Sequence, residues 1–593
     1  MSMFTPHRRS FERAAFGIAL ACWIAGVAHA AAPAARPAPE HPSGWIDKQA
    51  VHAKHWMVAT ANPLATKAGY GVLARGGNAV DAAIAVQLVL GLVEPQSSGL
   101  GGGAFVLLHD APTRRLLAYD GRETAPAAAR PDRFLKDGRP LEFLDAVIGG
   151  RSVGVPGVVR LMEVMHRRHG RLPWASLFAP AIALAESGFA MSPRLHHVAG
   201  SDRHLSQPRL RAYLFDANGK VLPAGTMLRN PAYAQTLRAI AAGGADAFYT
   251  GAIAQDIVDT VTRHPFNPGD MTLADLAAYR VVVREPVCGG YREYRVCGFP
   301  APSSGGIAVL QMLGMLERFD VGAMAPAGFW SVHFMSEAGR LAFADRSVYL
   351  ADPAFVAPPA GLLDPAYLAA RSALIRSDAS LRRAMPGTPP ERVAPARKVA
   401  WGTDAALDLP STTHVSIVDA DGNALAMTST IEHQFGSHLM TAGGFLLNNE
   451  LTDFSFVPEE DGKPVANRVE GGKRPRSSMA PTIAYDRAGR VAIVLGSPGG
   501  SAIINYVAKS LLGIVDWKLD PQAAADLPNF GSRNGPTELE ADTDVVPLAP
   551  KLRALGADVA IGEQTSGVQA IVRTRDGWAG GADARREGTA MGR

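Results

Sequence analysis

The chain has 593 residues, of which 47% are hydrophobic and 19% are charged, a composition typical of globular proteins. Its mean hydropathy is +0.03, and no run of about 18 uncharged apolar residues follows the N-terminal segment, which excludes a polytopic membrane protein. The net formal charge of +4 indicates no preference for nucleic acid, and the lack of long biased tracts excludes a mostly disordered chain.

The first 30 residues have the pattern of an export signal. A basic region containing Arg8-Arg9 precedes a short apolar stretch, and the segment ends in Ala28-His29-Ala30, a small-x-small cleavage site. We therefore predict a signal peptide at 1–30, a flexible Ala/Pro-rich leader at 31–44, and a periplasmic or secreted protein. The apolar stretch is short for a bilayer span, which disfavours a retained anchor. The paired arginines leave both the general and the twin-arginine export routes open.

Removal of the signal would leave two cysteines, Cys288 and Cys297. The residues between them are typical of two short strands around a turn at Gly289-Gly290, so an oxidising compartment could pair the thiols across a hairpin. The spacing leaves a disulfide and two free thiols equally open. Two cysteines cannot hold together a chain of this length, so the fold must depend on a buried core.

The N-terminal two thirds of the chain is predicted to be mainly helical. Apolar spacing predicts two helices within 61–92, joined at Gly76-Gly77-Asn78. The glycine-dense segment at 97–103 leads into an apolar strand. Because these glycines precede a strand and do not open a helix, they argue against a dinucleotide site. Residues 380–410 are rich in proline, arginine and alanine, and we expect a linker there.

Helices dominate the pattern from 152 to 380, with breaks expected at Pro156-Gly157, Pro193, Pro231 and Pro265 to Gly269, and a long amphipathic helix is expected after Gly306.

The pattern changes at Thr412, where two alternating segments flank a DADGN turn at 419–423 and predict a β-hairpin. The expected strands that follow lie at 444–449, 481–486, 490–497 and 568–574, and the expected helices lie at 501–512 and 521–525. The C-terminal third is therefore predicted to be a sheet with helices.

Several common catalytic signatures are missing from the sequence: it has no HExxH, Cys-x-x-Cys or phosphate loop, and its histidines lack metal-ligand spacing. The remaining candidate is the hydroxyl-rich start of the hairpin, after the linker. A threonine becomes a nucleophile when a base removes its proton, and its own α-amino group can be that base. This chemistry requires cleavage between Ser411 and Thr412. Two β-branched residues that merely begin a strand are the alternative.

Ordered motifs along the chain extend this interpretation. They are GGNAVDAAIA, SSGLGGGAFVLL, GRETAPA, SVGVPGVV and PAPSSGG, followed by TTHVSIVDADGNALAMTSTIEHQFG, LLNNELTDFS, GGKRPRSSMAPT and VLGSPGGS. From about residue 45 to the C-terminus the chain resembles the γ-glutamyltransferases (γ-glutamyltranspeptidases), members of the N-terminal nucleophile hydrolase superfamily. The resemblance implies an α+β fold, a four-layer αββα sandwich. It also implies one domain built from a large subunit, 45–411, and a small subunit, 412–593, produced by autoproteolysis.

The resemblance also assigns catalytic residues. Thr412 corresponds to the nucleophile, which first attacks the carbonyl of Ser411 and later attacks the substrate. Thr430 corresponds to the second threonine, which hydrogen-bonds the nucleophile and its amine. Gly499 and Gly500 correspond to the oxyanion hole, where each backbone N–H donor typically contributes roughly 10²- to 10³-fold in rate.

The substrate-binding residues follow from the same resemblance. Arg122, Ser477 and Ser478 correspond to the clamp for the α-carboxylate of the substrate, and arginine suits this task because its planar fork meets a carboxylate through two hydrogen bonds. The residues expected to hold the α-amino group are Glu450, Asp453 and Glu432. Many family members carry asparagine in place of Glu432, so the ammonium site is expected to be more acidic here.

Two further segments belong to this region. Residues 455–472 correspond to a lid loop whose length varies within the family, so coverage of the site by a lid stays open. The neighbouring basic cluster of Lys473, Arg474 and Arg476 is expected to orient the serine segment.

The function implied is transfer of the γ-glutamyl group of glutathione, or of another γ-glutamyl amide, through a Thr412 acyl-enzyme to water, an amino acid or a peptide. No metal or organic cofactor, no nucleic acid and no membrane span after signal removal are expected. A cephalosporin (glutaryl) acylase of the same fold is one alternative, although a glutaryl group lacks the amine that the three carboxylates would hold. A non-catalytic binder of γ-glutamyl ligands is the other, and the intact set of catalytic residues argues against it.

Overall fold

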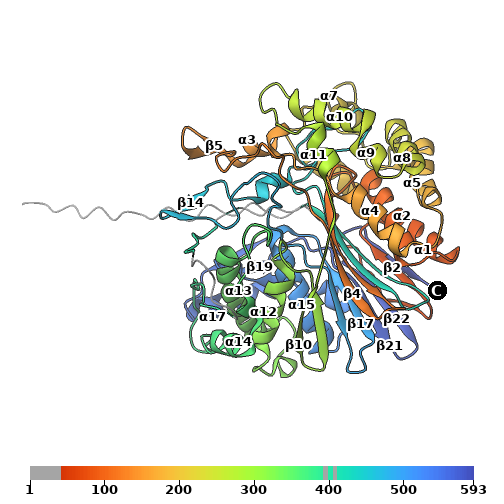
Figure 1. Cartoon of the computed structure of the whole chain (residues 1–593). Helices are drawn as coiled ribbons and strands as arrows, with labels where there is room; N and C mark the ends of the chain where they lie inside the picture. Colours follow the sequence, from red (N-terminus) through yellow and green to blue (C-terminus); the bar gives the residue numbers. More distant parts are fainter. Residues whose placement is uncertain (1–41, 392–398, 405, 407–410) are drawn as a thin grey trace, which may run out of the picture. The chain divides into compact units, whose positions relative to one another are not determined.

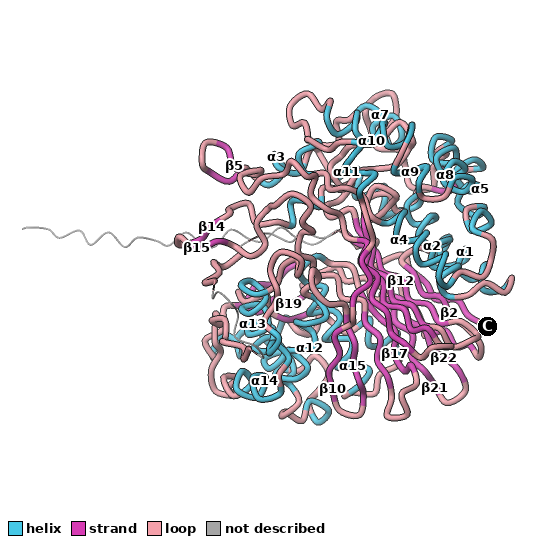
Figure 2. The backbone as a smooth tube through the Cα atoms, viewed as in Figure 1, coloured by secondary structure: helices cyan, strands magenta, loops and turns pink. Residues whose placement is uncertain are grey.

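The computed structural model describes residues 42–391, 399–404, 406 and 411–593. Two seven-stranded antiparallel sheets form its centre, with helices on both sides (Figures 1 and 2). The first sheet contains, in spatial order, β23 (Thr589–Gly592), β2 (Met57–Thr60), β12 (Thr412–Val418), β13 (Ala424–Thr430), β3 (Gly103–Asp110), β4 (Arg115–Gly121) and β9 (Val282–Arg284). The second contains β1 (Val51–Ala53), β22 (Gly577–Ala582), β21 (Gln569–Thr574), β17 (Val491–Gly496), β16 (Thr482–Tyr485), β11 (Tyr294–Gly298) and β10 (Val287–Tyr291).

Side chains of the first sheet alternate between two hydrophobic cores. Val106 and Leu108 of β3 belong to the core beneath the N-terminal helices, whereas Phe105 and Leu107 belong to the core shared with the second sheet. The ring of Phe105 lies 4.3 Å, between centroids, from that of Phe299, which follows β11. This alternation is the two-residue period of a strand buried on both faces. It produces the predicted helix–sheet–sheet–helix layers and confirms the αββα fold class.

Helices α1 (Pro63–Ala74) and α2 (Ala79–Val93) pack in the core that covers the first sheet. The Asn78 side chain accepts from the backbone N–H groups of Val80 and Asp81, and the Asp81 carboxylate accepts from the N–H of Asn78, so a capping box starts α2. The helix pair predicted around Gly76-Gly77-Asn78 is confirmed.

Further helices on this side are α3 (Phe143–Val147), α4 (Val158–His169), α5 (Ala179–Ser187), α6 (Pro193–Ser201), α7 (Pro208–Leu214), α8 (Pro231–Gly243), α9 (Asp246–Tyr249), α10 (Gly251–Thr262) and α11 (Leu273–Ala278). Pro193 and Pro231, expected as breaks, are the first residues of α6 and α8, a position where the missing N–H of proline costs nothing.

The second sheet is covered by α12 (Gly305–Leu316), α15 (Ile503–Val515) and α16 (Pro521–Asp526), with α13 (Phe329–Tyr349), α14 (Pro365–Ser372) and α17 (Ala549–Ala554) nearby. The long amphipathic helix expected after Gly306 is instead two helices, α12 and α13, separated by a connection that contains the 3₁₀ segment Val321–Ala323. Almost every residue of α12 is buried because α13 and α14 pack against the side that faces away from the sheet.

Small sheets complete the described chain: β5 (Leu135–Lys136) with β6 (Arg139–Pro140), β7 (Phe189–Ala190) with β8 (Met227–Leu228), β14 (Glu459–Glu460) with β15 (Lys463–Pro464), and β18 (Phe530–Gly531), β19 (Thr537–Glu540) and β20 (Val559–Gly562) together.

The cysteine hairpin exists, but its turn differs from the prediction. Cys288 of β10 and Cys297 of β11 are directly opposite and form a disulfide. The turn lies at Arg292-Glu293, where Arg292 has a φ of 52°, and the expected turn at Gly289-Gly290 is wrong. Both glycines lie inside β10. The lack of a side chain at Gly289 lets Leu310 of α12 pack against the strand, whereas a Cβ atom at Gly290 would meet nothing within 4 Å.

The strand predicted at 444–449 is also wrong, because this segment forms only isolated bridges, Met440 to Leu446 and Gly101 to Leu447. Its backbone N–H groups bond to separate loops: that of Asn448 donates to Gly101 and that of Asn449 to Ile431. The hairpin at Thr412 and the strands and helices predicted after residue 480 are confirmed, with shifts of a few residues at their ends.

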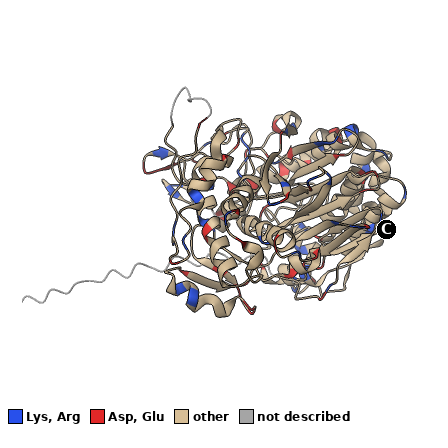
Figure 3. Ribbon diagram, turned by 90° about the horizontal axis from the view of Figure 1, so that it is seen from below, with Lys and Arg blue, Asp and Glu red and all other residues tan. Residues whose placement is uncertain are grey.

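Residues 1–41 lie outside the described part of the chain, and with them the predicted signal and most of the leader. Among the described residues, no helix combines the length and apolarity needed to cross a bilayer. Basic and acidic residues are interspersed along the ribbon, in agreement with the small net charge (Figure 3).

Substitution of Asp81 by alanine should lower the free energy of unfolding by about 2–3 kcal/mol, because the backbone N–H groups of Asn78, Arg171 and Leu172 all donate to this fully buried carboxylate. Urea unfolding measures the loss. Asp216→Ala is the matched control, because Asp216 accepts backbone N–H groups in an exposed turn where water can replace it. Equal losses for the two variants would contradict the capping argument.

Candidate active site

Thr412 and Thr430 lie opposite each other at the open end of the central hairpin. Thr412 is the first residue of β12, Thr430 is the last of β13, and their Cα atoms are partners in the ladder. Their exposed fractions are only 4% and 3%. The Thr430 hydroxyl accepts the N–H of Glu432 at 2.8 Å and donates to the carbonyl oxygen of Ser411 at 2.6 Å. A hydroxyl donor therefore points at the carbonyl that Thr412 would attack.

Ser411 is held by Gln96, which directly precedes the glycine-dense segment at 97–103. The Ser411 hydroxyl donates to the carbonyl of Gln96 at 2.5 Å, and that carbonyl also accepts the N–H of Phe435 at 3.2 Å. A Cβ atom at Gly102 would lie 2.1 Å from the carbonyl oxygen of Thr430, so the glycines let this segment approach the end of the hairpin. Sequence reasoning missed Gln96, because it acts through its backbone.

Gly499 and Gly500 follow β17 and turn the chain into α15. Their φ angles are 135° and 55°, a region that favours glycine, and a Cβ atom at Gly499 would lie 2.5 Å from the ring of Tyr506. The sharp turn starts a 3₁₀ segment at Gly500. Gly500 lines the same cavity as Thr412.

One small cavity brings the candidate residues together. Its volume is about 20 Å³, which suffices for a water molecule but not for a glutamyl group. It is lined by Arg122, Thr412, Thr430, Glu432, Glu450, Asp453, Ser477, Ser478, Met479, Gly500 and Ile503. The predicted residues that do not line it, Ser411 and Gly499, are each next in sequence to one that does. Substrate binding therefore requires side chains or the Ser411 segment to move.

Arg122 lies in the wall of this cavity, only 1% exposed, and forms ion pairs with Glu450 and Asp453. Its guanidinium also donates to the carbonyls of Pro475 and Arg476 at 3.1 and 3.0 Å. Burial alone would lower the pKa of Arg122, but the two carboxylates raise it above its ordinary value. The residues predicted to hold the two ends of a substrate thus hold one another, so a substrate carboxylate must displace a protein carboxylate.

A buried glutamate that the sequence reasoning missed adjoins this group. Burial raises the pKa of Glu123 to about 8, and burial likewise raises the pKa of Glu450 to about 8, with the neighbouring Glu123 carboxylate acting in the same direction. Its position directly after Arg122 in the GRETAP motif could have identified Glu123 as a candidate site residue. The carboxyl groups of Glu123 and Glu450 therefore bind protons near neutral pH.

The two serines present hydroxyl donors to the cavity. Ser477 Oγ accepts the N–H of Met479 at 3.1 Å, and Ser478 Oγ accepts from Arg346 Nη2 at 2.8 Å. Among the described residues, neither hydroxyl donates to a protein acceptor. Because each serine oxygen already accepts a hydrogen bond, each hydroxyl proton is available to an anion in the cavity.

Glu432 is oriented by its neighbours. Its φ of 74° is uncommon for a residue with a side chain, and such conformations concentrate at functional sites. The Asn449 amide and the Thr452 hydroxyl, the latter at 3.4 Å, both donate to its carboxylate. Asn449 belongs to the LLNNELTDFS motif, but the motif alone did not predict this contact.

The described residues offer no side-chain base to Thr412 other than carboxylates. The neighbouring His414 contacts Thr428 and Ser416 along the hairpin and does not line the cavity. Burial lowers the pKa of His414 to about 3, so its ring is neutral and weakly basic. Within the described ranges, no group of three or more His, Cys, Asp or Glu side chains suits a metal ion.

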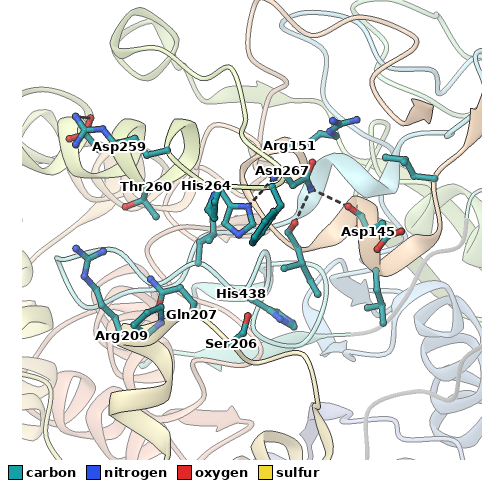
Figure 4. A pocket seen from close by; sticks show the side chains of 18 of the residues that line it. Asp145, Arg151, Ser206, Gln207, Arg209, Asp259, Thr260, His264, Asn267 and His438 are labelled. Atoms are coloured by element: carbon teal, nitrogen blue, oxygen red, sulfur yellow. Dashed lines mark hydrogen bonds and ion pairs between the residues drawn. The ribbon is translucent and has the colours of Figure 1, made fainter. Parts of the chain in front are cut away.

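A much larger cavity, of about 1070 Å³, lies among α3, α7 and α10 (Figure 4). His264, Asn267 and His438 are among the residues that line it, and it shares no lining residue with the small cavity. Size therefore does not identify the active site here. The small cavity is the better candidate because a threonine at a strand start, an arginine and several carboxylates converge on it.

Two stacked antiparallel sheets between helical layers, with a threonine beginning a central strand, define the architecture of the N-terminal nucleophile hydrolases. The family model for γ-glutamyltranspeptidase matches residues 65–593, and the chain belongs to this family.

Individual relatives agree with this placement. The glutathione hydrolase proenzyme of Bacillus subtilis (strain 168) is 35% identical over 554 residues, 92% of each chain. The acylase ACY 1 proenzyme of Pseudomonas sp. (strain V22) is also 35% identical, over 93% of this chain and 96% of its own. Among solved structures, the cephalosporin acylase of Bacillus halodurans superimposes with a TM-score of 0.79 at 27% identity, covering 95% of this chain and 99% of that one.

The buried carboxyl of Glu123 predicts a pH dependence of stability. An acid whose pKa rises from 4.5 to about 8 on folding binds a proton in the folded state that the unfolded state has lost, so stability falls as the pH rises through this window. Glu123→Gln should remove this contribution, and the variant should gain stability relative to wild type as the pH rises. Thermal unfolding midpoints of the two proteins at pH 5, 7 and 9 measure this difference in stability. The exposed Glu285→Gln is the control, and parallel profiles for wild type and Glu123→Gln would contradict the prediction.

Proposed function

We propose that the protein transfers the γ-glutamyl group of glutathione, or of a similar γ-glutamyl amide, to water or to an amino acid or peptide. The observation that carries the proposal is the convergence of Thr412 with Arg122, Ser477 and Ser478 and with three carboxylates on one cavity. A hydroxyl nucleophile beside groups of both charges suits an amino-acid zwitterion with a reactive side-chain amide. Relatives named glutathione hydrolase proenzymes support the same activity.

Maturation is the first reaction in this proposal. Thr412 Oγ1 attacks the carbonyl carbon of Ser411, and the Thr430 hydroxyl stabilises the negative charge that develops on the carbonyl oxygen. The C–N bond to Thr412 breaks as its nitrogen takes a proton, which leaves an ester between Ser411 and the Thr412 side chain. Water hydrolyses the ester, and Thr412 becomes the N-terminus of the small subunit.

Turnover repeats this chemistry on the substrate. The free α-amino group of Thr412 takes the hydroxyl proton, since the pKa of such amines lies near 8. The oxygen attacks the γ-carbonyl, the N–H groups of Gly499 and Gly500 stabilise the oxyanion, and the protonated amine departs. Water or an acceptor amine then attacks the Thr412 ester. Arg122, Ser477 and Ser478 hold the α-carboxylate, and Glu432, Glu450 and Asp453 hold the α-ammonium group.

A glutaryl acylase is the second candidate, because relatives and a structural neighbour are named acylases. A glutaryl group carries no amine. Once its carboxylate has displaced Glu450 or Asp453 from Arg122, it would offer the displaced carboxylate no cationic partner. Buried charges without partners are costly, which favours the γ-glutamyl substrate.

The proposal also includes export through the predicted signal, so the activity would be located in the periplasm or outside the cell.

Thr412→Ala should remain a single chain, whereas the wild type should separate into two, because the substitution removes the oxygen that attacks Ser411. Intact-mass analysis and N-terminal sequencing of the fragments measure this. Thr413→Ala is the matched control, since Thr413 is the adjacent buried hydroxyl residue of the same strand, and this variant should still be cleaved. Cleavage of Thr412→Ala between residues 411 and 412 would overturn the mechanism.

The substrate class is tested by comparing two anilides that differ in one group. The γ-glutamyl anilide should have a kcat/KM at least roughly 10-fold above that of the glutaryl anilide, because loss of a charged hydrogen-bonding partner at a buried site costs this much or more. Preference for the glutaryl compound would favour the acylase. Cleaved protein that binds γ-glutamyl compounds without releasing product would identify a binder.

A further inference from the structure

Arg346, near the C-terminal end of α13, lies directly behind the serine pair of the candidate site. It is 4% exposed and does not line the small cavity. Its Nη2 atom donates to Ser478 Oγ at 2.8 Å, and its Nε atom donates to Ser304 Oγ at 2.8 Å. Ser304 in turn donates to the carbonyl of Ser477 through both its hydroxyl and its backbone N–H, each at 2.7 Å. The Arg346 guanidinium thus contacts Ser478 directly and is connected to Ser477 through Ser304.

The side chain of Arg476, which precedes the two serines, attaches this segment to α13 as well. Arg476 Nη1 donates to the carbonyl of Arg346 at 3.3 Å, and Arg476 Nη2 lies 2.8 Å from a carboxylate oxygen of Asp404. The carbonyl of Arg476 accepts from Arg122. Arg122 and the two serines, which reach the cavity from different parts of the chain, are therefore aligned by the same short segment.

We infer that Arg346 is a positioning residue that prepares Ser478, and Ser477 through Ser304, to bind the α-carboxylate of the γ-glutamyl donor. A guanidinium can only donate hydrogen bonds, so Ser478 Oγ must accept from it, and the serine proton is left to point into the cavity. The positive charge behind the hydroxyl also favours an anion in front of it. The inference rests on the proposed function and adds to it a determinant of specificity outside the cavity.

This role predicts a selective defect. A residue that only supports the fold would affect all substrates alike, whereas Arg346 should matter only for donors that carry an α-carboxylate. The 4-aminobutyryl anilide is a γ-glutamyl anilide without that carboxylate and makes the comparison direct. The probes are therefore the γ-glutamyl anilide and the 4-aminobutyryl anilide, assayed on fully cleaved enzyme.

Arg346→Met keeps the length of the side chain and removes its donors. It should raise KM for the γ-glutamyl anilide by roughly 10-fold or more, since hydrogen bonds that involve charged groups contribute at this level. Its kcat should change less than KM, and its kcat/KM for the 4-aminobutyryl anilide should stay within about twofold of wild type. Arg346→Lys, which retains a charged donor, should recover part of the loss.

Two further variants separate positioning from general support. If Arg346 acts through Ser478, the double variant with Ser478→Ala should be little worse than Ser478→Ala alone. Arg340→Met is the matched control: Arg340 is a fully buried arginine of the same helix that contacts Glu337 and Thr537 and neither serine. Arg340→Met should leave unchanged the ratio of kcat/KM for the γ-glutamyl anilide to kcat/KM for the 4-aminobutyryl anilide. Ser304→Ala removes the hydroxyl that connects Arg346 to the Ser477 carbonyl and keeps the backbone N–H contact. It should lower the ratio of kcat/KM for the γ-glutamyl anilide to that for the 4-aminobutyryl anilide, and it provides the test if the Arg346 variants are not cleaved.

Equal losses on both anilides, or additive effects in the double variant, would overturn the inference while leaving the proposed function intact. A wild-type enzyme that is cleaved but does not turn over the γ-glutamyl anilide would overturn the proposed function and this inference with it.

Discussion

The register between β12 and β13 is the constraint on which the site depends. It sets Thr412 opposite Thr430 at the end of the hairpin, and the hydroxyl of Thr430 thereby reaches the carbonyl of Ser411. A shift of one residue would turn every side chain of the strand to the opposite face of the sheet. Such a shift is disfavoured because Val415 and Ile417 fill the core under α2, while the other face of the hairpin packs against the second sheet. The sandwich core thus positions the reacting atoms.

Charge is the second constraint, and it opposes stability. Arg122, Glu123, Glu450 and Asp453 are buried together, and desolvating so many ionisable groups is costly even when they pair. Their mutual contacts keep the cluster neutral enough to fold. These contacts also occupy the groups that would otherwise hold a ligand, so ligand binding exchanges partners within the cluster. A site that recognises a zwitterion needs both charges in one place, so the desolvation of these groups is a requirement of the site.

Local patterns predicted much of this structure. The β12–β13 hairpin follows from alternation around a DADGN turn, and α1 and α2 follow from helical spacing on either side of Gly76-Gly77-Asn78, because these signals lie within or next to the elements themselves. The turn at Arg292 and the irregular path of 444–449 could not be predicted in this way. Both depend on distant partners: Arg292 donates to the carbonyls of Glu317 and Phe319, just after α12, and Leu447 forms a bridge with Gly101.

The site likewise combines features that the sequence predicts with features that depend on tertiary contacts. Motif resemblance named most of the residues that line the cavity, with Met479 and Ile503 as the exceptions. The roles of Glu123, Asn449 and Arg346 depend on tertiary contacts. Arg346 meets Ser478 across more than a hundred residues. A single sequence gives no sign of such a contact, since a buried arginine on a helix has many alternative partners. Burial and hydrogen-bond direction, which only coordinates provide, distinguish among them.

The strand order has a consequence for the lifetime of the assembled enzyme. In the first sheet, β2, β3, β4 and β9 come from the region before Ser411, and β23, β12 and β13 come from the region after it. The second sheet is mixed in the same way. Chains cut between Ser411 and Thr412 would be interleaved through both sheets, and dilution alone could not separate them. Their dissociation would require both sheets to come apart, so the unfolding rate, and not a binding equilibrium, would determine how long the pair survives.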